Sequence, residues 1–142
     1  MAKIPSSAEL LAVQKTPTVV HFEITAADAT QVFAIPVKAG TFVHQVATFV
    51  STAFNGASTP SLKIGDGTNL NGYLNTSDVD LANVDTAATS SIGGGEAFAG
   101  GKYYSVDDTI DLTFVLGAST AGKVKGFVVL SNVKLDGITE DA

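Results

Sequence analysis

The sequence predicts an all-β protein, an antiparallel β-sandwich or jelly-roll-like domain with a short N-terminal helical arm. Three observations lead to this fold class. Apolar and polar residues alternate with a period of two in several segments, clusters of Gly, Asn, Asp and Ser separate these segments, and only the residues before Pro17 carry a helix signal. Strands with this spacing are typical of sandwiches and jelly rolls. We therefore expect an arm at residues 1–17 and a single β domain at residues 18–142.

The arm begins with a capping box, in which Ser6 is the N-cap residue and Glu9 stands at the third helical position. Pro17 prevents the helix from continuing, and a helix of only a few turns is marginal in water. Its apolar side chains therefore need a surface, which another copy of the chain or another protein could offer. Packing on the chain's own β domain is the alternative. The candidate partner-binding residues are Ile4, Leu10, Leu11 and Val13.

The first predicted strands follow directly after the arm. In residues 19–24, Val20, Phe22 and Ile24 share one face while His21 and Glu23 share the other. Residues 31–37 repeat the alternation, and Pro36 favours an edge position because it cannot donate a backbone hydrogen bond. Further strands are predicted at residues 41–50, at residues 61–64 and near Tyr73.

The last two predicted strands, residues 109–116 and 123–130, alternate most clearly. We expect them to form a hairpin across the turn at residues 117–122. Residues 75–91 and 93–101 are instead rich in small and polar residues, which cannot fill a core. Both segments are therefore predicted to be surface loops.

The composition narrows the range of partners. With 142 residues the chain fits one domain, and its charged fraction of 15% is well below the roughly 25% typical of soluble domains, which suggests a surface partly covered by other subunits. All eight basic residues are lysine and the net charge is −6. An acidic chain without arginine is not expected to bind nucleic acid or an anionic membrane surface.

Cysteine and long apolar segments are both absent from the sequence. Disulfides, thiolate metal sites and thiol nucleophiles are therefore excluded. No apolar run approaches the roughly 20 residues that span a bilayer, and the N-terminus lacks the apolar core of a signal peptide. We expect a soluble protein that is made in a cytosol.

Two segments resemble ligand-binding loops. Residues 117–123 match most of the P-loop pattern, but Val124 replaces the Ser or Thr, and a strand rather than a helix is expected to follow. The loop that begins at Asp66 is rich in oxygen ligands, yet it lacks the Gly and Glu that an EF-hand needs at its sixth and twelfth positions. An irregular cation site remains open as an alternative to ordinary Asp and Asn turns, and its candidates would be either Asp78, Asp80 and Asp85 or Asp107, Asp108 and Asp111.

The residues that could support catalysis are few. His21 and His44 are the only histidines, and both lie in predicted strands without an obvious partner. No nucleophile elbow, zinc-binding helix motif or pair of carboxylates appears. An aromatic platform for a sugar could use only Tyr73, Tyr103 and Tyr104, which packing on a strand face explains equally well. We therefore expect a non-enzymatic protein with no catalytic residues, no cofactor and no required metal.

Four segments carry a resemblance to a known class of proteins. They are Leu62-Lys-Ile-Gly-Asp-Gly-Thr68, Asn69-Leu-Asn-Gly-Tyr-Leu74, Tyr103-Tyr-Ser-Val-Asp-Asp-Thr-Ile-Asp-Leu-Thr-Phe-Val115 and Gly122-Lys-Val-Lys-Gly-Phe-Val-Val-Leu130. In these turn and strand patterns the C-terminal half resembles small β-rich virion proteins of tailed bacteriophages, and above all capsid decoration, or cement, proteins.

The resemblance implies a jelly-roll-like subunit, usually a homotrimer, that sits on the outer surface of the phage head and binds the major capsid protein. It also implies that an N-terminal arm grips the shell. A tail-fibre, receptor-binding or carbohydrate-binding β module is the alternative for a β-rich chain of this kind.

Overall fold

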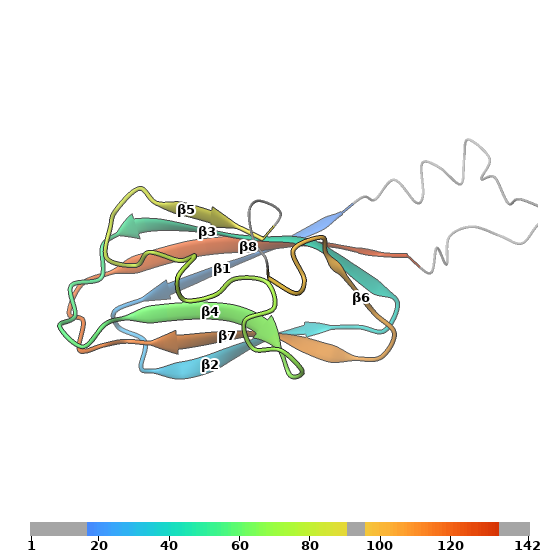
Figure 1. The fold of residues 1–142 in the computed structure, drawn as a ribbon, viewed down its shortest axis with the longest axis horizontal. Coiled ribbons are helices and arrows are strands. Elements are labelled where there is room, and N and C mark those ends of the chain that lie inside the picture. Colours follow the sequence, from blue (N-terminus) through green and yellow to red (C-terminus); the bar gives the residue numbers. More distant parts are fainter. Residues whose placement is uncertain (1–16, 91–95, 134–142) are drawn as a thin grey trace, which may run out of the picture.

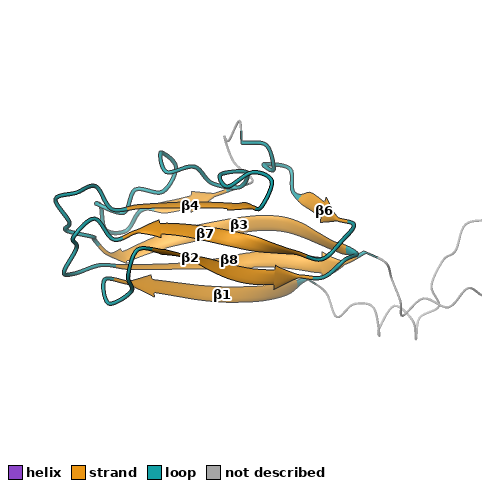
Figure 2. Ribbon diagram, turned by 90° about the horizontal axis from the view of Figure 1, so that it is seen from below, coloured by secondary structure: helices purple, strands orange, loops and turns teal. Residues whose placement is uncertain are grey.

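The computed structural model describes residues 17–90 and 96–133, which form two antiparallel β-sheets packed face to face (Figures 1 and 2). These described residues contain no helix, which confirms the all-β prediction. The strands are β1 (Thr18–Thr25), β2 (Gln31–Val37), β3 (Thr41–Thr52), β4 (Ser61–Asp66), β5 (Ala87–Thr89), β6 (Lys102–Tyr104), β7 (Asp108–Val115) and β8 (Lys123–Asn132).

The two sheets have simple strand orders. The first, which we call sheet A, has the order β1-β8-β3-β5, and β6 pairs with the other end of β3. The second, sheet B, has the order β2-β7-β4, and an isolated bridge between Ile64 and Leu74 lies beyond β4. Along the described strands the chain changes sheets at every step except the one from β5 to β6 (Figure 1).

The core lies between the sheets and is formed by the apolar side of each alternating strand. Ile24, Phe114 and Val128 are 2%, 0% and 0% exposed, and each belongs to the apolar face that period-two alternation predicts. Phe54, which follows β3, packs edge to face on Phe114 with ring centroids 5.6 Å apart. Burial of these side chains is the main force that holds the two sheets together.

The predicted strands before residue 65 and after residue 108 are confirmed, most of them to within two residues. Residues 31–37 form β2 with the predicted bounds, and β2 lies at the edge of sheet B, as Pro36 indicates. The expected strand near Tyr73 is reduced to the single bridge at Leu74. The helical arm at residues 1–17 and its boundary with the β domain fall almost wholly outside the described residues.

The predicted hairpin at the end of the chain is wrong. Strand β7 pairs with β2 and β4 in sheet B, whereas β8 pairs with β1 and β3 in sheet A. The connection at residues 116–122 therefore passes from sheet B to sheet A, and it is long enough to span the roughly 10 Å between packed sheets. Alternation shows which face of a strand is buried, but it does not show which strand is its partner. Two strands in different sheets alternate in the same way as the two strands of a hairpin.

One of the two predicted surface loops, residues 75–91, also needs correction. Residues 75–91 include strand β5 and three buried side chains, Val79, Leu81 and Ser90. Strand β6 follows residues 93–101 and pairs with β3 through Lys102 and Tyr104. Strands of three residues are too short to show a period of two, so neither β5 nor β6 carries a clear signal in the sequence.

Both described ends of the chain lie at one end of the sandwich. Thr18, the first residue of β1, is opposite Leu130 of β8, so β1 begins where β8 ends. The loops between β3 and β4 and between β7 and β8 lie at the opposite end (Figure 1). In the described part of the chain no helix has the length and apolar character needed to cross a membrane.

Candidate interaction surface

The outer face of sheet A carries three rows of side chains that the strand register places side by side. Paired residues of antiparallel strands point to the same side of the sheet, so each row crosses several strands. The rows are Val19, Val129 and Gln45; His21, Phe127, Ala47 and Thr89; and Glu23, Lys125, Phe49 and Ala87.

This outer face is unusually apolar for the solvent side of a sheet. An antiparallel sheet packed on one side normally presents polar residues on the other. Here Val19 and Phe49 are 46% and 42% exposed, and Phe127 and Val129 beside them are only half-buried. A contiguous apolar patch of this kind is typical of a surface that contacts another protein.

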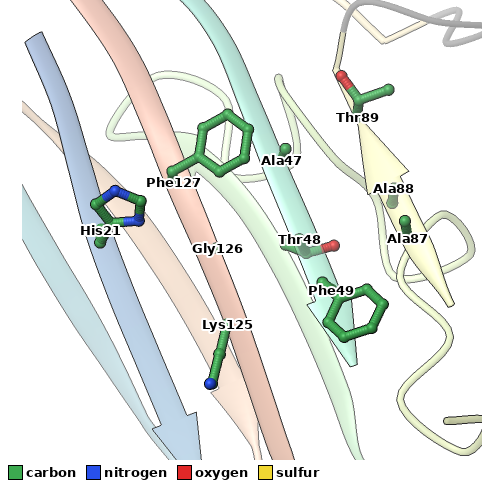
Figure 3. A pocket seen from close by; sticks show the side chains of 10 residues that line it. All are labelled: His21, Ala47, Thr48, Phe49, Ala87, Ala88, Thr89, Lys125, Gly126 and Phe127. Atoms are coloured by element: carbon green, nitrogen blue, oxygen red, sulfur yellow. The ribbon is translucent and has the colours of Figure 1, made fainter. Parts of the chain in front are cut away.

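A hollow of about 320 Å³ opens in this face (Figure 3). Phe49 and Phe127 stand at its sides, and Ala47 and Ala87 leave room between them. Gly126 has no side chain and contributes only backbone to the floor. On its inward side the ring of Phe22 lies 2.2 Å from where a Cβ would stand. Small residues on adjacent strands therefore produce the depression.

Positive or titratable groups in the hollow come from two adjacent strands. Lys125 is exposed and has no ion-pair partner among the residues that the structure describes. His21 packs edge to face against Phe127, with ring centroids 6.1 Å apart. The surface therefore combines an apolar floor with a lysine at one side, which suits an apolar segment that carries a carboxylate.

The outer face of sheet B is more polar. Its central strand β7 presents Thr109, Asp111 and Thr113 outward, and Lys63 of β4 stands beside Thr113. Its apolar outward residues include Val32 on the edge strand β2 and Val115 at the end of β7. The contrast indicates that sheet A is the side more suited to contact with a partner.

The P-loop-like segment has the geometry of a connection between strands. Lys123 begins strand β8 rather than a helix, and Gly122 precedes it with φ of +152°. The side chain of Asn55 accepts hydrogen bonds from the backbone amides of Thr120 and Ala121. Those amides are therefore directed at a side chain of the same protein, and no helix N-terminus is available for a phosphate.

Asp66 is the centre of a buried hydrogen-bond network rather than of a cation site. One carboxylate oxygen accepts hydrogen bonds from the backbone amides of Thr68 and Asn69 and from the Thr68 hydroxyl. The other accepts from Nζ of Lys102 at 2.5 Å and from the hydroxyl of Tyr104 at 3.0 Å. Five donors satisfy the carboxylate, so little capacity is left for a metal ion.

The environment of Asp66 shifts its titration. Burial by itself raises the pKa of the Asp66 carboxyl, but the hydrogen bonds from Lys102, Asn69, Thr68 and Tyr104 outweigh it and hold the pKa below its usual range. The hydroxyls of Tyr73 and Tyr104 lie 2.7 Å apart, and burial is the main reason that the pKa of each is raised. The network links the loop after β4 to strand β6.

The other acidic candidates accept hydrogen bonds from the protein itself or lie in turns. Asp78 accepts a hydrogen bond from the amide of Asn75, Asp80 from the amide of Ala82, and Asp107 from the amide of Ala39. Asp108 and Asp111 accept from the amide and the hydroxyl of Thr109, and Asp85 has φ of +63° in a turn. Within residues 17–90 and 96–133, no three Asp, Glu or His side chains are placed to hold a metal ion.

The histidines and tyrosines do not converge on one site. His44 lies 2.6 Å from the Ser131 hydroxyl through Nε2, whereas His21 lies in the hollow on sheet A. Tyr73 and Tyr104 are 0% and 3% exposed, so only Tyr103, at 45%, could stack on a ligand. Packing therefore accounts for two of the three tyrosines considered for a sugar platform.

The partner-binding residues expected from the sequence, Ile4, Leu10, Leu11 and Val13, lie outside the described residues. The sequence reasoning missed the outer face of sheet A. A signal was present, because Phe49 and Phe127 occupy positions that alternate with buried neighbours and would ordinarily be polar. The sequence alone does not show that these two side chains lie near each other; the pairing of β3 with β8 shows it.

Comparisons with known proteins show similarity in fold. No protein-family model and no curated protein matches the sequence. A chain of the solved structure "Cyanophage Pam1 capsid asymmetric unit" is 16% identical, with 81% of this chain and 84% of that chain covered and a TM-score of 0.58. A chain of "Capsid of Ralstonia phage GP4" is 13% identical, with 82% and 84% covered and a TM-score of 0.54. Both structural neighbours come from phage capsids, and the likeness spans most of the β domain.

Proposed function

We propose that this chain is a non-enzymatic structural protein of a bacteriophage virion, which decorates and stabilises the outer surface of the capsid as a homotrimer. Its partners would be other copies of itself and the major capsid protein, and it would reach the capsid surface after synthesis in the host cytoplasm. The observation that carries the proposal is the fold similarity to two phage capsid chains over four-fifths of the sequence.

The strand order supports a jelly roll. Sheet A has the order β1-β8-β3-β5, and sheet B, with the bridge at Leu74 as a short fourth member, has the order β2-β7-β4 followed by that bridge. β8 returns between β1 and β3, and β7 returns between β2 and β4, which is the interlocked arrangement of two Greek keys. Jelly rolls of this type form capsid domains in many viruses.

The character of the surface fits a protein that works by contact. Sheet A presents exposed Val19 and Phe49 beside Phe127, and the chain carries few charges. The Asp66 network and the Gly122–Lys123 connection, which resembled ligand sites in the sequence, are occupied by the protein's own side chains or continue into a strand. A role in assembly uses the apolar surface and requires no reactive group.

The copy number of the chain in purified virions tests this proposal. A capsid decoration protein should be among the most abundant proteins of the particle, comparable with the major capsid protein in quantitative mass spectrometry. A tail-fibre or receptor-binding module would instead be present in few copies. A scarce chain, or one absent from virions, would contradict the proposal.

A further inference from the structure

We propose that the hollow on the outer face of sheet A binds the N-terminal segment, residues 4–13, of a neighbouring copy of this chain. The inference rests on the proposed oligomer and names the contact that would hold it together. The hollow lies between Phe49 and Phe127 and opens to solvent in the described structure.

The chemistry of the segment matches the hollow. Ile4, Leu10, Leu11 and Val13 are the apolar residues of an otherwise polar or small-residue stretch, and too few to form a core of their own. If the predicted helix forms, Leu10 and Val13 lie one turn apart on the same face. Burial of Leu10 and Val13 in the hollow would help to offset the cost of ordering the segment.

Charge complementarity points to the same occupant. Lys125 stands at the side of the hollow without an ion-pair partner in the part of the chain that the structure describes. Glu9 immediately precedes Leu10, so a segment that places Leu10 in the hollow brings a carboxylate close to this lysine. Such a pair at the rim of an interface fixes orientation more than it adds affinity.

The length of the segment allows it to reach another subunit. Leu10 lies seven residues before Pro17, and an extended chain spans at most about 3.3–3.6 Å per residue, so Leu10 can lie up to roughly 25 Å from the start of β1. His21, which lines the hollow, lies only three residues after Thr18 in β1. Distance alone therefore permits either the chain's own hollow or that of a neighbour.

The residues around Pro17 favour the neighbour. Thr18 is already paired with Leu130, so Pro17 and Thr18 cannot form the corner of a turn that leads back over sheet A. Pro17 biases Thr16 toward an extended conformation. Residues 11–16 also contain no Gly, Pro, Asn, Asp or Ser, the residues most common in tight turns. The segment is therefore expected to leave β1 pointing away from its own sheet.

Disulfide cross-linking tests the contact, because the chain has no natural cysteine. Leu10→Cys on a tagged copy and Ala87→Cys on an untagged copy are co-expressed and oxidised in the absence of capsids. A disulfide forms only when the two Cα atoms come within about 7 Å. The proposal predicts a covalent dimer of one tagged and one untagged chain as the main product.

Ser77→Cys serves as the matched control, because it is exposed like Ala87 but lies outside the hollow. If Leu10→Cys links to Ser77→Cys as efficiently as to Ala87→Cys, the proposed contact is wrong. An intrachain disulfide as the main product of the Leu10→Cys/Ala87→Cys double variant would also overturn it, since the segment would then cover its own sheet. Neither of these results would contradict the proposed virion role, which the copy number in purified virions tests independently.

Discussion

The buried pair of Asp66 and Lys102 gives the sharpest test of what holds this fold together. Asp66 lies fully inside, whereas the side chain of Lys102 is 26% exposed. Nζ of Lys102 also lies 4.2 Å from the centre of the Phe98 ring and 4.9 Å from that of Tyr104. Lys102 therefore joins strand β6 to the end of β4 through a charged hydrogen bond, and its two cation–π contacts are with Phe98 before β6 and Tyr104 in β6 itself.

Lys102→Met preserves the length of the side chain but removes its charge. Asp66 then keeps its four neutral donors and loses its only charged partner. Hydrogen bonds to charged groups contribute about 1.5–3 kcal/mol, and we expect a loss of that size in the free energy of unfolding. The partial exposure of Lys102 places the expected value toward the lower part of this range.

Lys123→Met is the matched control. Lys123 lies 3.9 Å from Glu23, and their side chains are 40% and 48% exposed, so this surface pair should contribute only about 0–1 kcal/mol. Urea unfolding of both variants at one protein concentration gives the comparison. Asp66→Asn completes a double-mutant cycle with Lys102→Met, in which we expect a coupling above about 0.5 kcal/mol. A Lys102→Met variant no less stable than Lys123→Met would refute the reasoning.

Two further predictions concern acid stability and the core. The pKa of Asp66 is lowered from 3.8 in the folded protein, so its contribution to the free energy of unfolding is complete above pH 3.8 and is lost as the pH falls through the lowered pKa. Asp66→Asn should therefore flatten this acidic part of a plot of melting temperature against pH. Phe114→Ala should lower the free energy of unfolding by about 3–5 kcal/mol in urea titrations, whereas Val32→Ala, 55% exposed, should change it by at most about 0.5 kcal/mol. Equal effects of the two truncations would contradict the assigned core.

The strands could be predicted where one face is buried, but their partners could not. In β7 the buried residues Ile110, Leu112 and Phe114 follow one another at every second position, so alternation gives the strand and its inner face. The partner strand depends on the path of the chain between the sheets. A connection such as residues 116–122 can either form a hairpin or cross to the other sheet, and local composition does not distinguish the two.

Short strands were missed for a different reason. Ala87–Thr89 of β5 has no large side chain to mark an inner face, and its pairing depends on β3, about forty residues earlier in the chain. The buried role of Asp66 was equally hidden. Its neighbours Thr68 and Asn69 suggested an oxygen-rich loop, but the decisive partner, Lys102, lies 36 residues away in sequence.

The candidate surface could be recognised only in part. The low charge of the chain indicated that some surface is covered, but not where. Phe49 and Phe127 are far apart in sequence, and they belong to one surface because the pairing of β3 with β8 places them diagonally across adjacent strands. Sequence reasoning had placed the contact in Ile4, Leu10, Leu11 and Val13 alone, and the structure adds a surface that could receive them.

Binding to expanded, undecorated phage capsids is the most direct test of the proposed role. Purified protein is mixed with these shells, and the bound fraction is measured after sedimentation and located by cryo-electron microscopy. Our account predicts saturable binding at fixed positions on the outer surface, with raised resistance of the shells to heat. Protein that stays in the supernatant at saturating concentration, or that binds only at the tail, would contradict it.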